Sequence, residues 1–420
     1  EAVARLCRLD AAQLQVMHAA LAQMAARGLR VLGVARGVLH DAQWPPSPHA
    51  IEFEWLGLIG LEDPVRPTAA AAVRECREAG IRVVMITGDY PATAIAIAAQ
   101  AGIHVDDGVV TGAQIEAMDD ATLCARIRSS SVYARVAPVQ KLRLIQAFKT
   151  AGEVVAMTGD GVNDAPALKA AHIGIAMGGR GTDVAREAAA LVLLDDDFDS
   201  IVSAVRLGRR IYRNIRNAMR YLLAVHVPTA GMAFLPLLFG WPVAFFPLHV
   251  VFIEFVSDPA CSVVFEAEPA DANSMRVPPR APDAQLFDLP TLAISLLQGA
   301  GVFAAVAWVY SHALLSGEGE SAARTVAFMT IIVGNLALIL SNRSGSRSLI
   351  ETVSAPNPAL WWVVGGALVA LCIVLVVPTL RDLFRLAEPP LADVVMSAAA
   401  AVASVMWFEI YKLFRRRAAD

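Results

Sequence analysis

Long apolar runs dominate the second half of this 420-residue sequence, and they restrict its fold more than any other feature. They lie near residues 219–239, 243–264, 289–311, 324–341, 359–379 and 390–411. Each run is close to the roughly 20 apolar residues that an α-helix needs to cross a bilayer. Backbone polar groups in lipid must be bonded within the protein, which favours helices for such runs. Residues 219–412 are therefore predicted to form an all-α membrane bundle of six transmembrane helices.

The basic residues of this half indicate how the bundle is oriented. Few of them lie in the connections 240–242, 312–323 and 380–389, and most lie in 206–218, 265–288, 342–358 and the tail 413–420. Cytoplasmic loops carry the excess of lysine and arginine. We therefore expect a multi-pass protein of the plasma membrane whose soluble half and C-terminus are cytoplasmic. The Ala- and Arg-rich composition and the short loops favour a bacterial inner membrane.

The first half reads as a soluble α/β domain. Predicted strands at 81–86, near 109, and at 132–134, 153–157 and 173–176 alternate with predicted helices at 69–79, 93–101, 118–128, 139–150 and 165–170. This alternation favours a mainly parallel sheet with helices on both faces, which gathers ligands at the carboxyl ends of its strands. The net charge of −4 gives no reason to expect nucleic-acid binding. The five cysteines lack metal-ligand spacing, which favours reduced thiols.

The strongest chemical signal follows the predicted strand at 153–157, in the sequence Thr-Gly-Asp-Gly-Val-Asn-Asp from Thr158 to Asp164. Its glycines permit a tight turn that brings Asp160 and Asp164 together at the strand end. Two carboxylates there suit Mg²⁺, which prefers oxygen ligands and bridges carboxylate to phosphate. Asn163 adds an uncharged donor for a phosphate oxygen. A turn rich in Asp and Asn without metal binding is the alternative interpretation.

Two further motifs fit phosphate chemistry. Thr87-Gly88-Asp89 ends the predicted strand at 81–86 and offers a hydroxyl and backbone N–H groups to a phosphoryl group. Lys141 stands near the start of a predicted helix, where its ammonium can neutralise a transferring phosphoryl group. A solvated surface lysine is the alternative for Lys141 taken alone.

Together these motifs resemble the haloacid-dehalogenase-like (Rossmann-type) phosphorylation domain of P-type ATPases. The resemblance rests on Gly60-Leu-Glu-Asp-Pro64, Thr87-Gly-Asp89, Ala134-Arg-Val-Ala-Pro138 with Lys141, and the 158–164 motif. Gly208-Arg-Arg-Ile-Tyr-Arg-Asn214 and Met275-Arg-Val-Pro-Pro-Arg280 resemble the type II branch, which contains calcium, sodium/potassium and proton pumps. The resemblance implies an ATP-driven cation transporter that works through an aspartyl-phosphate intermediate.

The resemblance also assigns roles to residues. Asp160 would ligate Mg²⁺ with support from Asp164 and Asn163, and Lys141 would neutralise the phosphoryl charge. Thr87 and Gly88 would bind the phosphoryl oxygens. Asp63 would contact the ribose of ATP, and Arg30 would approach its phosphates.

The domain boundaries follow from the same resemblance. Residues 1–50 would be the C-terminal remnant of a nucleotide-binding domain, 51–205 the phosphorylation domain and 206–218 a basic cytoplasmic stalk. The family phosphorylates the Asp of Asp-Lys-Thr-Gly-Thr, and no Asp-Lys pair occurs in this sequence. We therefore expect a C-terminal fragment that needs the N-terminal half of the same pump and is inactive alone.

Polar residues interrupt the first two apolar runs and predict a cation path. Glu254 and Asp258 are four residues apart and share one helix face, and ionisable groups in a bilayer by default mark an ion path. Pro228 and Pro259 lack N–H groups, so they free the carbonyls of residues 224 and 255 for a cation. The other candidates are His226, Thr229, Ser257 and Asn335. For Thr229, Ser257 and Asn335, hydrogen bonding between helices is the alternative role.

The identity of the cation stays open. By resemblance to calcium pumps, Asp258 is retained, whereas His226 replaces Asn, Thr229 replaces Glu and Glu254 replaces Asn. Ca²⁺ is the first candidate, and the imidazole makes Mn²⁺ a second, since imidazole suits transition metals. His226 could instead carry a counter-transported proton. A membrane-tethered phosphatase without ion transport and a non-catalytic remnant are the alternative functions.

Overall fold

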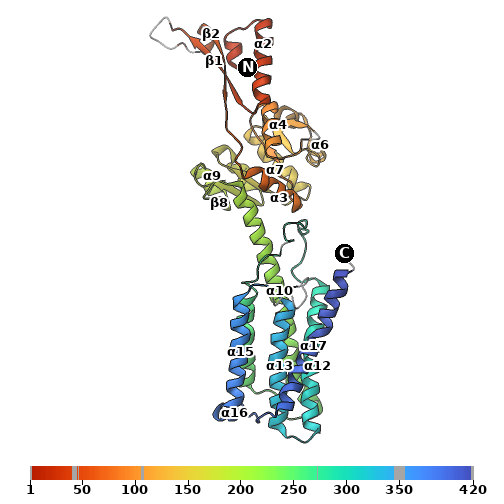
Figure 1. Ribbon diagram of the computed structural model, residues 1–420. Coiled ribbons are helices and arrows are strands. Elements are labelled where there is room, and N and C mark those ends of the chain that lie inside the picture. The colour runs from red at the N-terminus through yellow and green to blue at the C-terminus, as the bar shows by residue number, and fades with distance from the viewer. Residues whose placement is uncertain are drawn as a thin grey trace. The chain divides into compact units, whose positions relative to one another are not determined.

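The computed structural model describes residues 2–39, 45, 47–105, 108–271, 273–344 and 355–417. The chain folds into two compact units (Figure 1). The first comprises Glu1–Arg206 together with Asn273–Pro282, and the second comprises Leu207–Ala272 together with Asp283–Asp420.

An antiparallel ribbon opens the first unit. Strands β1 (Arg30–Gly37) and β2 (Phe53–Leu61) pair from Arg30 opposite Leu61 to Gly37 opposite Phe53. The neighbouring helical elements are α1 (Ala2–Leu6), α2 (Ala11–Ala26) and η1 (Pro48–Ala50). Asp10 begins α2, because its carboxylate accepts the N–H of Gln13 while the Gln13 side chain accepts the N–H of Asp10.

The rest of the first unit contains two parallel three-stranded sheets. One has the order β3-β5-β4 and the other β6-β7-β8, which confirms the predicted parallel pairing. The strands are β3 (Met85–Ile86), β4 (Val109–Thr111), β5 (Val132–Ala134), β6 (Ala156–Gly159), β7 (Ile173–Met177) and β8 (Leu191–Leu193). The helical elements are α3 (Ala69–Glu78), α4 (Pro91–Gln100), α5 (Gly112–Ala117), α6 (Asp120–Arg126), α7 (Pro138–Thr150), η2 (Val162–Asp164), α8 (Ala165–Ala170) and α9 (Asp183–Ala188).

The helix predicted at 118–128 is confirmed as α6, which begins where the Asp119 carboxylate accepts the N–H of Thr122. The preceding helix α5 was not predicted. Both helices contribute to the same core, through Ile115 and Leu123.

Helix α7 connects the cores of the two sheets. Leu144 and Phe148 belong to the core of the β3-β5-β4 sheet, together with Tyr133. Ile145 belongs to the core of the β6-β7-β8 sheet, together with Met157. The middle of α7 therefore packs into the cores of both sheets.

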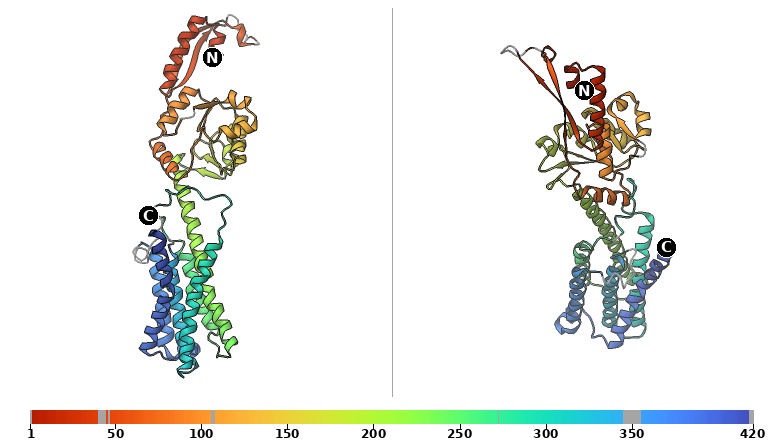
Figure 2. Two further views of the ribbon diagram at one scale, coloured as in Figure 1. Left: turned by 90° about the vertical axis from the view of Figure 1, so that its right-hand side faces the viewer. Right: turned by 45° about the horizontal axis from the view of Figure 1, so that its top comes forward.

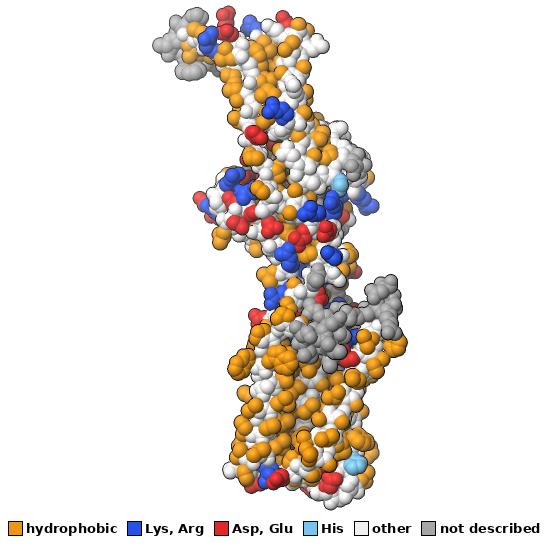
Figure 3. Space-filling model, in the orientation of Figure 1, with side chains coloured by type: hydrophobic (Ala, Val, Ile, Leu, Met, Phe, Trp, Pro, Cys, Tyr) orange, Lys and Arg blue, Asp and Glu red, His pale blue; other side chains and the backbone are white. Residues whose placement is uncertain are grey.

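The second unit contains the helices that the sequence predicted for the membrane. Six helices in the described residues are long and apolar enough to cross a membrane, and Figure 1 and Figure 2 show them side by side. They are α10 (Phe198–Phe239), α11 (Pro247–Pro259) with the π-helical η3 (Ala260–Val264), α12 (Leu289–Leu315), α13 (Glu320–Asn342), α15 (Pro358–Val376) and α17 (Leu391–Arg417), and the short α16 (Pro378–Leu383) lies between the last two. On the face that Figure 3 shows, apolar side chains make up most of the surface of this bundle. The predicted stalk at 206–218 and first span at 219–239 form one continuous helix, α10.

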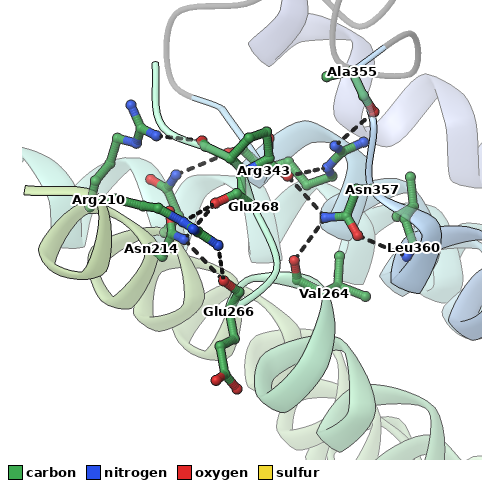
Figure 4. Close-up of polar contacts among 12 residues, drawn as sticks. Arg210, Asn214, Val264, Glu266, Glu268, Arg343, Ala355, Asn357 and Leu360 are labelled. Carbon is green, nitrogen blue, oxygen red and sulfur yellow. Dashed lines mark hydrogen bonds and ion pairs between the residues drawn. The ribbon is translucent and has the colours of Figure 1, made fainter. Parts of the chain in front are cut away.

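A buried polar network ties four segments of the second unit together (Figure 4). The Glu268 carboxylate accepts hydrogen bonds from Arg343 Nε at 2.8 Å and from Asn357 Nδ2 at 3.1 Å. Its backbone carbonyl accepts from Arg210 Nε and Asn214 Nδ2, each at 2.9 Å. The segment after η3 is thereby bound to α10, to the end of α13 and to the start of α15.

Candidate functional site

The structure brings Lys141 and Asp164 into direct contact. Lys141 lies in the first turn of α7, and its Nζ donates to Asp164 Oδ1 at 2.6 Å. The other oxygen of Asp164 accepts the N–H of Gly161 at 3.4 Å. Gly159 lies so close that an added Cβ would approach the Asp164 Cβ to 2.6 Å, which explains a glycine at the end of β6. The pair is largely buried, with 18% and 10% of the side chains exposed.

The Thr87-Gly88-Asp89 turn is bound to the segment that leads into α7. Val136 N–H donates to the carbonyl of Thr87 and Arg135 N–H to that of Asp89, each at 3.0 Å. Within the turn, the Thr87 hydroxyl donates to Asp89 Oδ2 at 2.8 Å. The turn at the end of β3 and the lysine of α7 are therefore held by one continuous stretch of backbone.

Asp160 follows β6 directly, and its side chain is exposed. Its carboxylate has no hydrogen-bond partner among the residues that the structure describes, whereas the carboxylate of Asp164 is engaged by Lys141. No group of three His, Cys, Asp or Glu side chains that could hold a metal occurs in the described part of the chain. One free carboxylate fits Mg²⁺, which keeps several waters and takes oxygens from a phosphate rather than from a protein cage.

The remaining soluble candidates lie at the surface. Arg30 begins β1, and its Nε lies 3.9 Å from Asp89 Oδ1, a contact that the sequence did not predict. Asp63 follows β2 and is exposed. Asn163 lies in η2, between the two acidic residues of its motif. The ATP contacts assigned to Arg30 and Asp63 stay predictions.

The intramembrane candidates divide by burial. Glu254 is half-buried in α11, Ser257 is buried, and Asp258 and His226 are exposed. The hydroxyl of Ser257 donates to the carbonyl of Ile253 at 2.9 Å in its own helix. The hydroxyl of Thr229 likewise donates to Val225, one turn back in α10, at 3.2 Å. The ion-binding roles of these residues stay predictions.

Asn335 is the most deeply buried candidate of the membrane half. Phe328 of α13 packs against the rings of His249 and Phe252 of α11, with centroids 5.0 and 5.4 Å away. Asn335 lies two turns further along the same face of α13. Its side chain is 1% exposed, and neither amide atom has a hydrogen-bond partner among the described residues. Hydrogen bonding between helices does not account for this amide.

The two prolines have different surroundings. An added Cβ on Gly299 of α12 would come within 2.3 Å of the carbonyl oxygen of Ala224, the group that Pro228 leaves without its helical partner. That carbonyl is therefore directed at α12. Pro259 stands where α11 gives way to the π-helical turn of η3, directly after Asp258. Such turns occur frequently at functional sites.

Sequence reasoning missed a loop beside Asp160. Residues 178–182 follow β7, and Thr182 N–H donates to the carbonyl of Asp160 at 2.9 Å. The charged side chains of Arg186 and Asp196 bind this loop. Their partners are backbone groups, which leave no pattern in a sequence.

Comparison with known proteins agrees with this geometry. A family model described as "haloacid dehalogenase-like hydrolase" matches residues 14–172, and one described as "Cation transporting ATPase, C-terminus" matches residues 242–414. The chain is 31% identical over 416 residues to Calcium-transporting ATPase 1 of Saccharomyces cerevisiae, covering 98% of this chain and 44% of that protein. The chain belongs to the P-type ATPases. The predicted fold class, a haloacid-dehalogenase-like domain with a helical membrane bundle, is confirmed.

Other P-type ATPases match over similar parts of their length. The calcium-transporting ATPase of Bacillus subtilis is 35% identical over 378 residues, which cover 88% of this chain and 42% of that protein. Cation-transporting ATPase pma1 of Synechocystis is 38% identical over 350 residues, which cover 80% of this chain and 38% of that protein. The chain spans less than half the length of these relatives.

Proposed function

We propose that this chain supplies the phosphate-binding half and six membrane helices of an ATP-driven cation pump that works through an aspartyl-phosphate. The contact between Lys141 and Asp164 beside the free carboxylate of Asp160 carries this proposal. An ammonium against a carboxylate at a strand end, with an open metal ligand next to it, provides positive charge where a phosphoryl group would be transferred.

Asp160 would bind Mg²⁺ directly. Asp164 would support the site by holding the ammonium of Lys141 beside it. Held there, Mg²⁺ would supply positive charge that neutralises the phosphates of the nucleotide. The chain's own residues would orient the phosphoryl group through Thr87 and the N–H of Gly88, and Arg30 and Asp63 would contact the nucleotide.

The aspartate that accepts the phosphoryl group would come from a segment bearing Asp-Lys-Thr-Gly-Thr, a motif that the 420 residues do not contain. The exposure of His226 and Asp258 also supports a further part of the same pump, because ionisable groups in membrane helices almost always face the bundle interior. A further set of helices from the same pump would cover them. The soluble unit and the C-terminus would face the cytoplasm of a bacterial cell.

Glu254, Asp258 and Asn335 would form the core of the cation site. Two carboxylates and an amide are hard oxygen ligands that suit Ca²⁺, and the calcium-transporting relatives support Ca²⁺ as the first candidate. His226 keeps Mn²⁺ as the second candidate.

Cation uptake into membrane vesicles tests this function. The complete protein should accumulate ⁴⁵Ca²⁺ or ⁵⁴Mn²⁺ only when ATP is present, and Glu254→Gln should reduce uptake by roughly 10-fold or more. Glu266→Gln is the matched control, since Glu266 is exposed just beyond the same helix. ATP hydrolysis without uptake of either ion, unchanged by Glu254→Gln, would favour a tethered phosphatase instead.

A further inference from the structure

The 178–182 loop holds the backbone of Asp160 where the sheet no longer does. Pairing between β6 and β7 ends at Gly159 opposite Ala176. One residue beyond that pair, the carbonyl of Asp160 accepts the N–H of Thr182 at 2.9 Å. The loop therefore holds the backbone of Asp160, one residue beyond the last pair of the sheet, while the Asp160 carboxylate is exposed.

Two opposite charges fix this loop from its two sides. Arg186 of α9 donates through Nη1 to the carbonyls of Gly178 at 2.9 Å and Gly181 at 2.6 Å. The carboxylate of Asp196 accepts the N–H groups of Gly179 at 3.0 Å and Arg180 at 2.9 Å. One cation thus binds two carbonyls of the loop, and one anion binds two of its N–H groups. Hydrogen bonds with a charged partner are roughly twice as strong as neutral ones.

The loop also lies too close to the sheet to move freely. An added Cβ on Gly181 would approach the carbonyl oxygen of Met177 to 1.9 Å, and one on Gly178 would approach that of Leu193 to 2.7 Å. The path of the loop backbone is therefore fixed by contact with β7 and β8 on one side and by Arg186 on the other.

We propose that Arg186 is a positioning residue for the divalent cation at Asp160. It holds the 178–182 loop, the loop holds the Asp160 backbone through Thr182, and the Asp160 carboxylate is thereby directed toward the metal. Asp196 serves the same purpose from the opposite side. This inference rests on the proposed function in one respect, the assignment of Mg²⁺ to Asp160. Groups that orient a metal ligand typically change metal affinity by roughly 10- to 100-fold when removed.

A purely local role for Arg186 makes a different prediction. Arg186 also forms an ion pair with Asp183, three residues earlier in α9. If that pair were its whole purpose, loss of Arg186 would lower the melting temperature slightly and leave metal binding intact. Metal affinity and hydrogen exchange of the Thr182 amide therefore distinguish a positioning role of Arg186 from a purely local one.

Mn²⁺ binding to the purified full chain in detergent is the first measurement, with free Mn²⁺ followed by electron paramagnetic resonance. Asp160→Asn identifies the binding that belongs to Asp160. We expect Arg186→Ala to weaken that binding roughly 10-fold or more, and Arg186→Lys to restore part of it. Arg180→Ala is the matched control, because it also removes one arginine charge near Asp160 but keeps the backbone N–H that Asp196 binds.

Hydrogen exchange of the Thr182 amide is the second measurement. We expect exchange to quicken roughly 10-fold in Arg186→Ala and in Asp196→Ala, but not in Arg180→Ala. Equal Mn²⁺ affinity in Arg186→Ala and Arg180→Ala would overturn the inference, even if the melting temperature fell. Unchanged Mn²⁺ binding in Asp160→Asn would instead contradict the metal assignment of the proposed function. Thr182 exchange would then still report whether Arg186 restrains the Asp160 backbone.

Discussion

Lys141 Nζ lies 2.6 Å from Asp164 Oδ1, and each side chain is less than one-fifth exposed. The two residues are separated by 23 positions and reach each other from α7 and η2. Leu144 and Ile145, in the turn after Lys141, anchor α7 in the cores of the two sheets. The fold thereby brings the ammonium and the carboxylate into contact.

Removal of either partner should destabilise the first unit. Lys141→Met leaves a largely buried carboxylate unpaired, and breaking such a pair costs about 3 kcal/mol. The double variant Lys141→Met with Asp164→Leu should recover a substantial part of that loss, because neither charge is then left alone. Hydrogen exchange in α7 measures the effect. Equal destabilisation in the single and double variants would contradict the prediction.

Glu268→Gln should destabilise the second unit more than Glu388→Gln does. Glu268 pairs with Arg343 in the interior, where the side chains are 3% and 0% exposed. Loss of its charge breaks the buried ion pair that Glu268 forms with Arg343, at a cost of about 3 kcal/mol. Glu388 pairs with Arg381 but is 80% exposed, so its loss should cost less than about 1 kcal/mol. Thermal unfolding in detergent compares the two, and equal melting temperatures would refute the prediction.

The first unit should lose stability at high pH through Tyr133. Burial raises the pKa of Tyr133 from about 10 to about 12, and the nearby Arg82 and Arg126 oppose that rise only in part. The folded state thus keeps the proton that the unfolded state releases. Stability from this group is complete below pH 10 and falls as pH rises toward 12, by about 3 kcal/mol at most. Tyr133→Phe should abolish this pH dependence. It also removes the hydrogen bond that the Tyr133 hydroxyl donates to the carbonyl of Ser130. Unfolding followed from pH 9 to pH 12, with tyrosinate absorbance, tests it; an unaltered slope in Tyr133→Phe would exclude Tyr133.

Asn335→Leu should reduce cation transport without destabilising the bundle. Its amide is buried without a partner among the described residues, so an apolar side chain of similar shape should be neutral or stabilising by about 1 kcal/mol. Thr330→Val is a control on the same helix, because its hydroxyl already donates to Val326 one turn back and should not contribute to transport. A lower melting temperature with normal uptake in Asn335→Leu would show that the amide is structural.

Local patterns in the sequence predicted much of this fold. Six helices were predicted because each needs only an uninterrupted apolar run, and the strand before Thr158 because a short apolar stretch is closed by glycines. The 158–164 motif was recognised for the same reason, and its phosphate-binding role stays a prediction. These signals lie within one segment of the chain.

Features that depend on distant partners could not be predicted. Arg186 and Asp196 bind backbone groups, and Arg343 meets Glu268 across 75 positions. Lys141 was a candidate from its place near a predicted helix start, and the family resemblance supported that choice over a solvated surface lysine. Only the fold shows that it reaches Asp164.

Phosphoenzyme formation from γ-labelled ATP measures whether this chain supplies the phosphate-binding half of a pump. We expect acid-stable, hydroxylamine-labile label on the complete protein that carries Asp-Lys-Thr-Gly-Thr upstream of this chain, and loss of that label in Asp160→Asn. We expect no label on the 420-residue chain alone. Label on the isolated chain, or undiminished label in Asp160→Asn, would contradict the proposed function.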